Sequence, residues 1–315
     1  MAPQINLENY PLVSITMSTY NGEQFLEEQL QTLIEQDYPN IEIIVCDDHS
    51  SDQTWQILQK WQIAYPKLIQ IFSNPENIGW SRNFGEAISH AKGQFIAWCD
   101  QDDKWMSDKI SAMVETFKKN PDASLVYHDA IQFRGDNETI VEKKDYFHWG
   151  TFQGTDPVSL FWHCRILGHR MMFKGELKKY ILPAISTSYD WWIQVLAASI
   201  GRVYYIDKKL VAQRKHENNA TGAKDPNMIG DCLLGRLQML EKFQIFRPLM
   251  KEKDGILLDK MTAIMRNHKR GKFDWTLFFF VLKYRYRLHN FLEGSNALGR
   301  EIFRWRLARS WAKNW

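Results

Sequence analysis

The residues with the clearest chemical potential form an acidic turn, Asp100-Gln101-Asp102-Asp103, directly after the apolar run 95–99. A short apolar run predicts a buried strand, and carboxylates cannot continue into a core because an unpaired buried charge is costly. Asp100 and Asp102 point the same way in an extended chain. Converging carboxylates suit a hard divalent cation, and such a cation suits a diphosphate. The alternative is an acidic turn in which Asp103 caps the next helix.

Strand-like runs alternate with helical patterns before this turn. The expected strands cover residues 11–17, 41–46, 68–72 and 95–99. The expected helices cover residues 23–36, 53–65 and 80–91. This βαβαβαβ order is typical of a parallel sheet with helices on both faces. Each strand ends in polar residues, and in open α/β sheets such loops line a nucleotide crevice along one edge.

The rest of the chain predicts a second region. Further strands are expected at 124–129, 166–173, 203–206 and 210–214, with a long polar loop over the site at 134–156. Beyond about residue 225 the pattern becomes helical, basic and aromatic. We therefore expect two domains, 1–224 and 225–315.

Composition excludes several classes of protein. The net charge of +3 is too mild to indicate nucleic-acid binding. The four cysteines are widely spaced, which favours free thiols in a reducing cytoplasm over disulfides or zinc. The first residues lack the layout of a signal peptide, and no apolar window reaches the roughly 18 residues of a spanning helix. Dinucleotide and P-loop glycine motifs do not occur.

Four polar motifs occur in the order and spacing of one known family. They are Ser18-Thr19-Tyr20-Asn21-Gly22, Asp47-Asp48-His49-Ser50-Ser51-Asp52, Asn77-Ile78-Gly79-Trp80-Ser81-Arg82-Asn83 and the acidic turn. Together they resemble family 2 glycosyltransferases of the GT-A fold, over about residues 11 to 222. Tyr189-Asp190-Trp191-Trp192 resembles the family's acidic catalytic motif, and residues 214–222 resemble its late R-x-H-x-x-N-x-x-G element. The acidic turn, with Lys104-Trp105 and Lys109, is similar to a rhamnosyltransferase-like subgroup.

The resemblance implies a GT-A (Rossmann-like), mostly parallel α/β sheet with helices on both faces, plus a C-terminal helical appendage. It implies an inverting, metal-dependent enzyme that moves a sugar from a nucleotide-sugar to a growing cell-surface polysaccharide, such as O-antigen, or to a lipid-linked glycan. dTDP-rhamnose is the first donor hypothesis and a UDP-hexose the second. One alternative is nucleotidyl transfer to a sugar phosphate. Enzymes of that class usually carry a Gly-rich loop with a basic residue after the first strand, and residues 18–22 do not form such a loop. The other alternative is a catalytically silent nucleotide-sugar-binding scaffold.

The resemblance also assigns roles to residues. Asp102 is expected to coordinate Mg²⁺ or Mn²⁺ on the donor's diphosphate, and His216 is a further metal ligand or a phosphate donor. Asp190 is the expected general base for the acceptor hydroxyl, or else a helix cap. Trp191 and Trp192 form an acceptor platform or are buried by their helix.

A nucleotide-sugar-binding set completes the expected site. Its members are Ser18, Thr19, Tyr20, Asn21, Asp47, Asp48, Asn77, Arg82, Asp100 and Gln101. Within it, Asp48 would accept the imino proton of a uracil or thymine ring, on which Tyr20 would stack. Arg82 either reaches a phosphate or lies at a helix start, and Asp100 faces the ribose or a metal-bound water.

Basic and aromatic residues at helical spacing in the C-terminal block suit a helix in an anionic membrane interface; the alternative is a helical cap on the catalytic domain. A lipid-linked acceptor would give membrane contact a purpose, so we expect a cytoplasmic enzyme at the inner face of the plasma membrane. No nucleic-acid module is recognised, and the sequence does not give the oligomeric state.

Overall fold

The computed structural model describes residues 7–134, 139–140, 151–182, 188–217, 232–268, 273–289 and 297–313. Much of the loop predicted at 134–156 lies outside these residues, as does the 218–222 part of the late motif. The chain divides into two compact units. Unit 1 comprises residues 1–143, 166–190 and 203–216. Unit 2 comprises residues 144–165, 191–202 and 217–315. The domain boundary near residue 224 stays a prediction.

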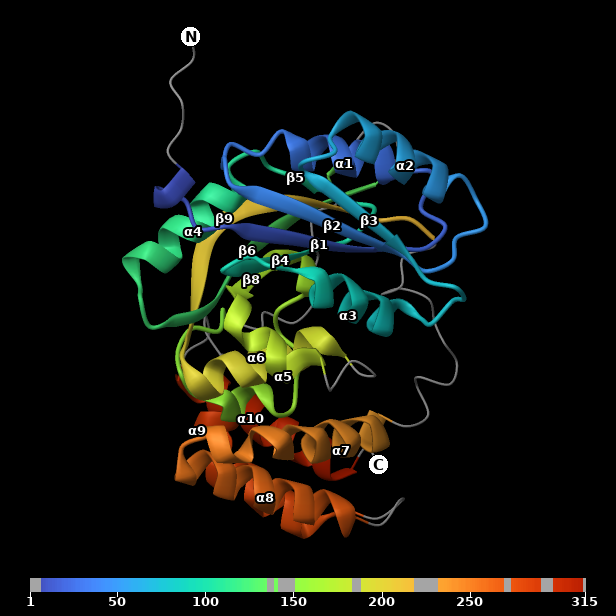
Figure 1. Cartoon of the computed structure of the whole chain (residues 1–315). Helices are drawn as coiled ribbons and strands as arrows, with labels where there is room; N and C mark the ends of the chain where they lie inside the picture. The colour runs from blue at the N-terminus through green and yellow to red at the C-terminus, as the bar shows by residue number, and fades with distance from the viewer. Residues whose placement is uncertain are drawn as a thin grey trace. The chain divides into compact units, whose positions relative to one another are not determined.

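The first half of unit 1 has the predicted alternation of strands and helices (Figure 1). Its elements are β1 (Val13–Thr19), α1 (Leu26–Ile34), β2 (Ile41–Asp47), α2 (Thr54–Ala64), β3 (Ile69–Ser73), α3 (Trp80–His90) and β4 (Phe95–Cys99). The four strands pair in parallel in the order β3-β2-β1-β4. The expected α/β fold class is confirmed.

The second half of unit 1 extends the same sheet with antiparallel pairs. Its elements are β5 (Lys104–Trp105), α4 (Lys109–Lys119), β6 (Ala123–Arg134), β7 (Thr139–Ile140), β8 (Met171–Lys174), α5 (Lys178–Ile181) and β9 (Arg202–Arg214). The sheet order continues from β4 as β8-β6-β9-β5, with β7 beside β6. Strand β8 pairs antiparallel with β4 and β6, and β5 pairs antiparallel with β9.

Two predicted strand boundaries in this half are wrong. The strands expected at 203–206 and 210–214 are one continuous strand, which runs through the exposed polar residues 207–209. The strand expected at 166–173 begins only at Met171, because residues 168–170 form a 3₁₀ turn.

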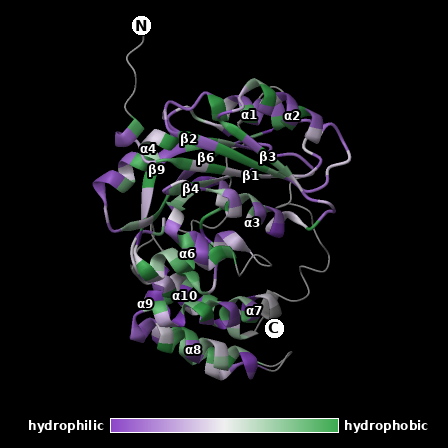
Figure 2. Cartoon of the chain, in the orientation of Figure 1, coloured by the Kyte–Doolittle hydropathy of each residue, from purple (hydrophilic) through white to green (hydrophobic). Residues whose placement is uncertain are grey.

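Alternation along the strands builds the core. Val13, Ile15 and Met17 are fully buried and pack with apolar residues of α1 and α4. Ser14 and Thr16 point to the opposite face, on the side where α3 packs. Figure 2 shows hydrophobic segments along the strands of this sheet.

The register of the parallel strands sets where the site forms. Thr19 of β1 lies opposite Asp47 of β2, and Met17 of β1 lies opposite Cys99 of β4. The chain therefore leaves all three strands at the same edge of the sheet. The residues that follow these strands, Tyr20, Asp48 and Asp100, are placed at this edge by the backbone pairing.

Unit 2 is helical. It contains the 3₁₀ segment η2 (Pro157–Leu160), α7 (Cys232–Phe243), η6 (Gln244–Leu249), α8 (Glu252–Arg266), α9 (Trp275–Leu288) and α10 (Ala297–Lys313). Helix α6 (Tyr189–Ile200) starts in unit 1 and continues in unit 2. Buried aromatic pairs join distant segments, such as Trp162 stacked on Trp311 at 4.1 Å. Among the helices that the structure describes, none is both long and apolar enough to cross a bilayer.

Candidate active site at the carboxyl edge of the sheet

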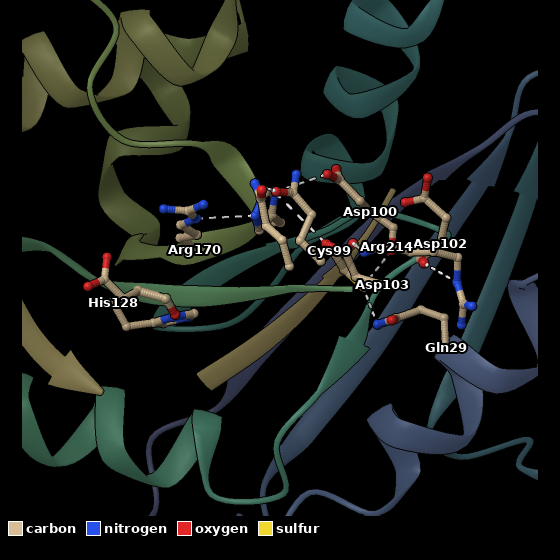
Figure 3. Close-up of polar contacts among 12 residues, drawn as sticks. Gln29, Cys99, Asp100, Asp102, Asp103, His128, Arg170 and Arg214 are labelled. Carbon is tan, nitrogen blue, oxygen red and sulfur yellow. Dashed lines mark hydrogen bonds and ion pairs between the residues drawn. The ribbon is translucent and has the colours of Figure 1, made fainter. Parts of the chain in front are cut away.

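Three carboxylates of the acidic turn lie close together after β4, as predicted (Figure 3). Their exposure differs: the Asp100 side chain is 36% exposed, Asp102 17% and Asp103 2%. Burial and the charge of Asp100 raise the pKa of Asp102, and His216 opposes this rise. Repulsion among crowded carboxylates is relieved when a cation binds them. The outer two carboxylates can therefore face a ligand, whereas Asp103 faces the protein.

Asp102 is paired with His216, so the two residues predicted as metal ligands are neighbours. The distance from Asp102 Oδ2 to His216 Nε2 is 2.7 Å. Arg214, two residues before His216, fixes the end of β9 against the turn: its Nε donates to Asp102 O at 3.1 Å and its backbone N–H donates to Asp103 Oδ1 at 3.0 Å. The Arg214 guanidinium also pairs with Glu28. The acidic turn and the end of β9, which are far apart in sequence, are thus held together by these hydrogen bonds.

Asp100 is oriented from the other side by His169, which the sequence did not single out as functional. His169 Nδ1 lies 3.1 Å from Asp100 Oδ2, and Arg170 Nε donates to His169 Nε2 at 3.3 Å. Accepting at Nε2 leaves the ring proton on Nδ1, so His169 donates to Asp100. Burial lowers the pKa of His169, which favours this neutral donor form.

Beneath the turn, Asp103 and Lys109 are both buried, and their opposite charges interact. Lys109 is fully buried; its Nζ donates to His169 O at 2.7 Å and lies 3.2 Å from the centre of the Trp105 ring. Burial lowers the pKa of Lys109 to about 7, and it raises the pKa of Asp103 well above its usual value. The opposite charge of each group counteracts the shift of the other. Lys109 thus places a buried amine, with a lowered pKa, under a cluster of carboxylates.

Two sets of residues could hold a divalent cation. Asp100, Asp103 and His169 offer ligand atoms within 4.8 Å of one another. However, Asp103 and His169 are almost fully buried, and Lys109 Nζ donates to the backbone carbonyl of His169. Asp102 and His216 are partly exposed, with Asp100 nearby. We favour Asp102 and His216, because a metal-bound diphosphate needs an open side.

Asp48 organises the loop that follows β3. Its carboxylate accepts hydrogen bonds from Asn74 Nδ2 at 2.8 Å, Ile78 N at 2.9 Å and Gly79 N at 2.8 Å. Gly79 has a φ of 87°, a left-handed conformation that glycine adopts without strain. A carboxylate has about four acceptor sites, so one remains at Oδ2, and Asp48 as a whole is only 1% exposed. Asn77 shapes the same loop by donating to Asp48 O at 3.3 Å.

The residues after β1 divide into structural and exposed groups. Asp47 is buried and accepts from Thr19 Oγ1 and from Ser50, and Ser18 accepts from Asn83 Nδ2 at 2.6 Å. Asn21 accepts from Ser51 N at 2.9 Å, and Gln101 holds both backbone groups of Tyr20. These polar side chains hold the loops at the carboxyl edge of the sheet in place. The Tyr20 ring is 48% exposed, and the Arg82 side chain is also exposed, so both can meet a ligand.

Asp190 is held at this edge by its neighbour Tyr189. The Tyr189 ring packs against Trp98 at 4.6 Å, and Trp98 is two residues before Asp100. Phe84 of α3 contacts the same ring at 4.7 Å. The first turn of α6 therefore lies beside the end of β4. Asp190 is partly exposed, and its Oδ1 accepts from Ser188 Oγ at 3.0 Å.

The structure gives less support to Trp191 and Trp192 as a platform for the acceptor. Trp192 is 2% exposed and packs on Phe246 of η6 at 4.3 Å, so its ring belongs to the core of unit 2. Trp191 is partly buried and donates from Nε1 to Leu160 O at 2.5 Å. The burial alternative holds for Trp192, because an aromatic pair in a helical core excludes a bound glycan from that face.

Comparison with known proteins decides the family. The sequence profile described as glycosyl transferase family 2 matches residues 14–180. The chain belongs to glycosyltransferase family 2. It is 29% identical over 223 residues to the dTDP-rhamnosyl transferase RfbG of Shigella flexneri, covering 66% of this chain and 74% of that relative.

Two solved structures share the fold of this family 2 glycosyltransferase. The S. aureus TarS fragment 1–349 in complex with UDP-GlcNAc superposes with a TM-score of 0.62 at 16% identity, covering 96% and 91% of the two chains. The mannosyltransferase PcManGT from Pyrobaculum calidifontis, in complex with GDP-Man and Mn²⁺, gives 0.55 at 17% identity, covering 96% and 83%. These two structures show the fold. A sugar-transferring, nucleotide-sugar-dependent activity follows from membership of glycosyltransferase family 2.

The burial of Lys109 near Asp103 predicts how substitutions there change the stability of the protein. Replacing Lys109 with methionine leaves Asp103 buried without a counter-charge, which is expected to lower the free energy of unfolding by about 3–5 kcal/mol at neutral pH. Adding Asp103→Asn should restore part of that loss, because the uncompensated charge is removed. Chemical denaturation of both variants measures this. Lys119→Met, on the exposed end of the same helix, is the control and should change stability by less than about 0.5 kcal/mol.

The deficit of the Lys109→Met variant should depend on pH. Without the ammonium, the folded-state pKa of Asp103 rises further above its unfolded value, so folding favours the protonated acid. Stability is then lost as pH rises, and the deficit should be larger near about pH 8 than near about pH 5. A deficit that does not change with pH, or one that Asp103→Asn fails to reduce, would show that Lys109 acts only through packing.

Proposed function

We propose that this glycosyltransferase moves rhamnose from dTDP-rhamnose to a growing cell-surface polysaccharide or lipid-linked glycan, with inversion at the anomeric carbon and with a bound Mg²⁺ or Mn²⁺. The name of the relative RfbG supports the rhamnose donor. The UDP-GlcNAc complex of TarS supports a UDP-linked sugar as the second donor hypothesis. Nucleotidyl transfer and a non-catalytic scaffold lose their support, since the chain belongs to a transferase family.

Each group has a defined task in this proposal. Tyr20 and the remaining acceptor site of Asp48 bind the base of the donor, and Asp102 and His216 hold the cation. The cation, when bound, stabilises charge on the departing nucleoside diphosphate. Asp190 takes the proton of the acceptor hydroxyl while its oxygen bonds to the anomeric carbon and the bond to the diphosphate breaks. Residues 1–224 would carry this chemistry.

The acceptor gives a reason for membrane contact. We propose that residues 225–315 bring the enzyme to the inner face of the plasma membrane, where a lipid-linked glycan would be extended. Exposed aromatic and basic side chains on α9 and α10 support this contact.

The strand register that brings Tyr20, Asp48 and Asp100 to one edge carries the proposal. A thermal-shift screen of dTDP-rhamnose, UDP-glucose, UDP-GlcNAc and GDP-mannose, each with Mn²⁺, tests the donor. The true donor stabilises the folded state by mass action, and we expect dTDP-rhamnose to raise Tm by several degrees. Stabilisation by UDP-sugars alone would overturn the rhamnose assignment. Release of inorganic diphosphate during turnover would instead indicate nucleotidyl transfer.

A further inference from the structure

Helix α9 is apolar on more than one side. Leu277, Phe280 and Val281 are buried in unit 2, yet Trp275 is 62% exposed and Phe279 60% exposed. Trp275 and Phe279 are four residues apart, and their rings stack at 6.0 Å. A surface helix normally turns its polar side to water, and a helix that is apolar all round has a second apolar neighbour. We therefore expect the exposed apolar side of α9 to contact a binding partner.

Helix α10 adds a second exposed apolar stripe beside the first. Ile302 is 46% exposed and Trp305 52% exposed, and they lie at helical spacing. The Trp305 ring is 5.7 Å from the Phe278 ring. The helices run antiparallel, since Asp274 N donates to Ala312 O at 3.0 Å while Arg285 pairs with Glu301 at 3.0 Å. The two stripes belong to one helical hairpin.

The same hairpin carries an excess of positive charge. Lys283, Arg306 and Arg309 are exposed, and none of them forms an ion pair with the residues that the structure describes. Glu301 is the only acidic residue in α9 and α10. It is paired with Arg285 and with Arg304, so it does not offset the exposed cations.

We propose that this aromatic–cationic face binds an anionic phospholipid surface. The face consists of Trp275, Phe279, Lys283, Tyr286, Ile302, Trp305, Arg306 and Arg309. Tryptophan and tyrosine rings favour the headgroup level of a bilayer, and Lys and Arg are attracted to anionic lipids. This proposal names the residues and the lipid chemistry of the membrane contact. Its biological purpose rests on the proposed function.

The charges argue against a second copy of the chain as the occupant. A two-fold dimer through this face would bring the same patch against itself. Exposed cations would then face exposed cations, and the one acidic side chain in the described residues of α9 and α10, Glu301, is already paired. An anionic lipid surface satisfies both the aromatic and the cationic side chains.

Co-sedimentation of the full chain with vesicles tests the inference. We expect binding to vesicles of phosphatidylglycerol and phosphatidylcholine, and weak binding to phosphatidylcholine alone. The variants Trp275→Ser/Phe279→Ser and Lys283→Gln/Arg306→Gln/Arg309→Gln should each bind at least about tenfold more weakly. Matched controls in unit 1 are Ile63→Ser, an exposed apolar residue, and Lys67→Gln/Lys179→Gln/Lys209→Gln, which removes the same charge. The controls should bind like wild type.

Three outcomes would overturn the inference: equal binding to both vesicle types, equal losses in face and control variants, or no vesicle binding together with a dimer that the face variants dissociate. Folding of each variant is checked by its thermal unfolding curve. The assay contains no donor, so the donor-induced rise in Tm, measured on the same preparations, reports on the proposed sugar transfer independently.

Discussion

Replacing Asp102 with asparagine is expected to lower kcat/KM for sugar transfer by at least about a thousandfold. The amide keeps the size of the side chain and an oxygen that can accept from His216 Nε2, now 2.7 Å from the carboxylate. It removes the negative charge that attracts a divalent cation. The loss should therefore appear in metal-dependent donor binding and in turnover, with little change in the free energy of unfolding. Steady-state kinetics over a range of Mn²⁺ concentrations measures it.

Asp207→Asn is the matched control, because Asp207 is an exposed carboxylate of the same sheet, in β9. It should retain wild-type kinetics. If Asp102→Asn kept more than about a tenth of wild-type kcat/KM at saturating Mn²⁺, a metal role for this carboxylate would be excluded.

Asp190→Asn is expected to lower kcat by about 10²–10⁴-fold while the KM for the donor stays near its wild-type value. An amide cannot take the proton of the acceptor hydroxyl, whereas the donor is held by other groups at the sheet edge. Product formation in single-turnover experiments separates this chemical step from binding.

Ser188→Ala is the companion variant. It removes only the hydroxyl that donates to Asp190 Oδ1 at 3.0 Å, so we expect a loss of a few-fold at most. Equal loss in both variants would point to a misplaced helix start rather than to a missing base. A donor KM that rises strongly in Asp190→Asn, with kcat preserved, would assign Asp190 to binding instead.

The sequence predicted those parts of the fold that local pattern determines. Strands β1 to β4 are short apolar runs between turn residues, so the hydrophobic pattern and the positions of the turn residues predict the same strands. The continuity of β9 was missed because its exposed residues 207–209 look like a turn, although they lie within a strand that is placed between β6 and β5 in the sheet. Tertiary pairing overrides local propensity there.

The site was predictable to the extent that motifs mark strand ends. The Asp102–His216 pair follows from two motifs of one family, and the structure brings them together. His169 and the burial of Lys109 could not be found this way. The contact of His169 with Asp100 spans 69 positions and arises only when β8 pairs with β4. The burial of Trp192 likewise depends on Phe246, a residue of a distant segment.

Calorimetric titration of dTDP and of UDP into the full chain, with Mn²⁺ and with EDTA, tests most directly whether this edge holds a cation together with a diphosphate. We expect at least one nucleotide to bind saturably with Mn²⁺, to lose at least about tenfold in affinity with EDTA, and to show the same loss in Asp102→Asn and in His216→Ala. Binding that is equally tight with EDTA and in both variants would contradict the account.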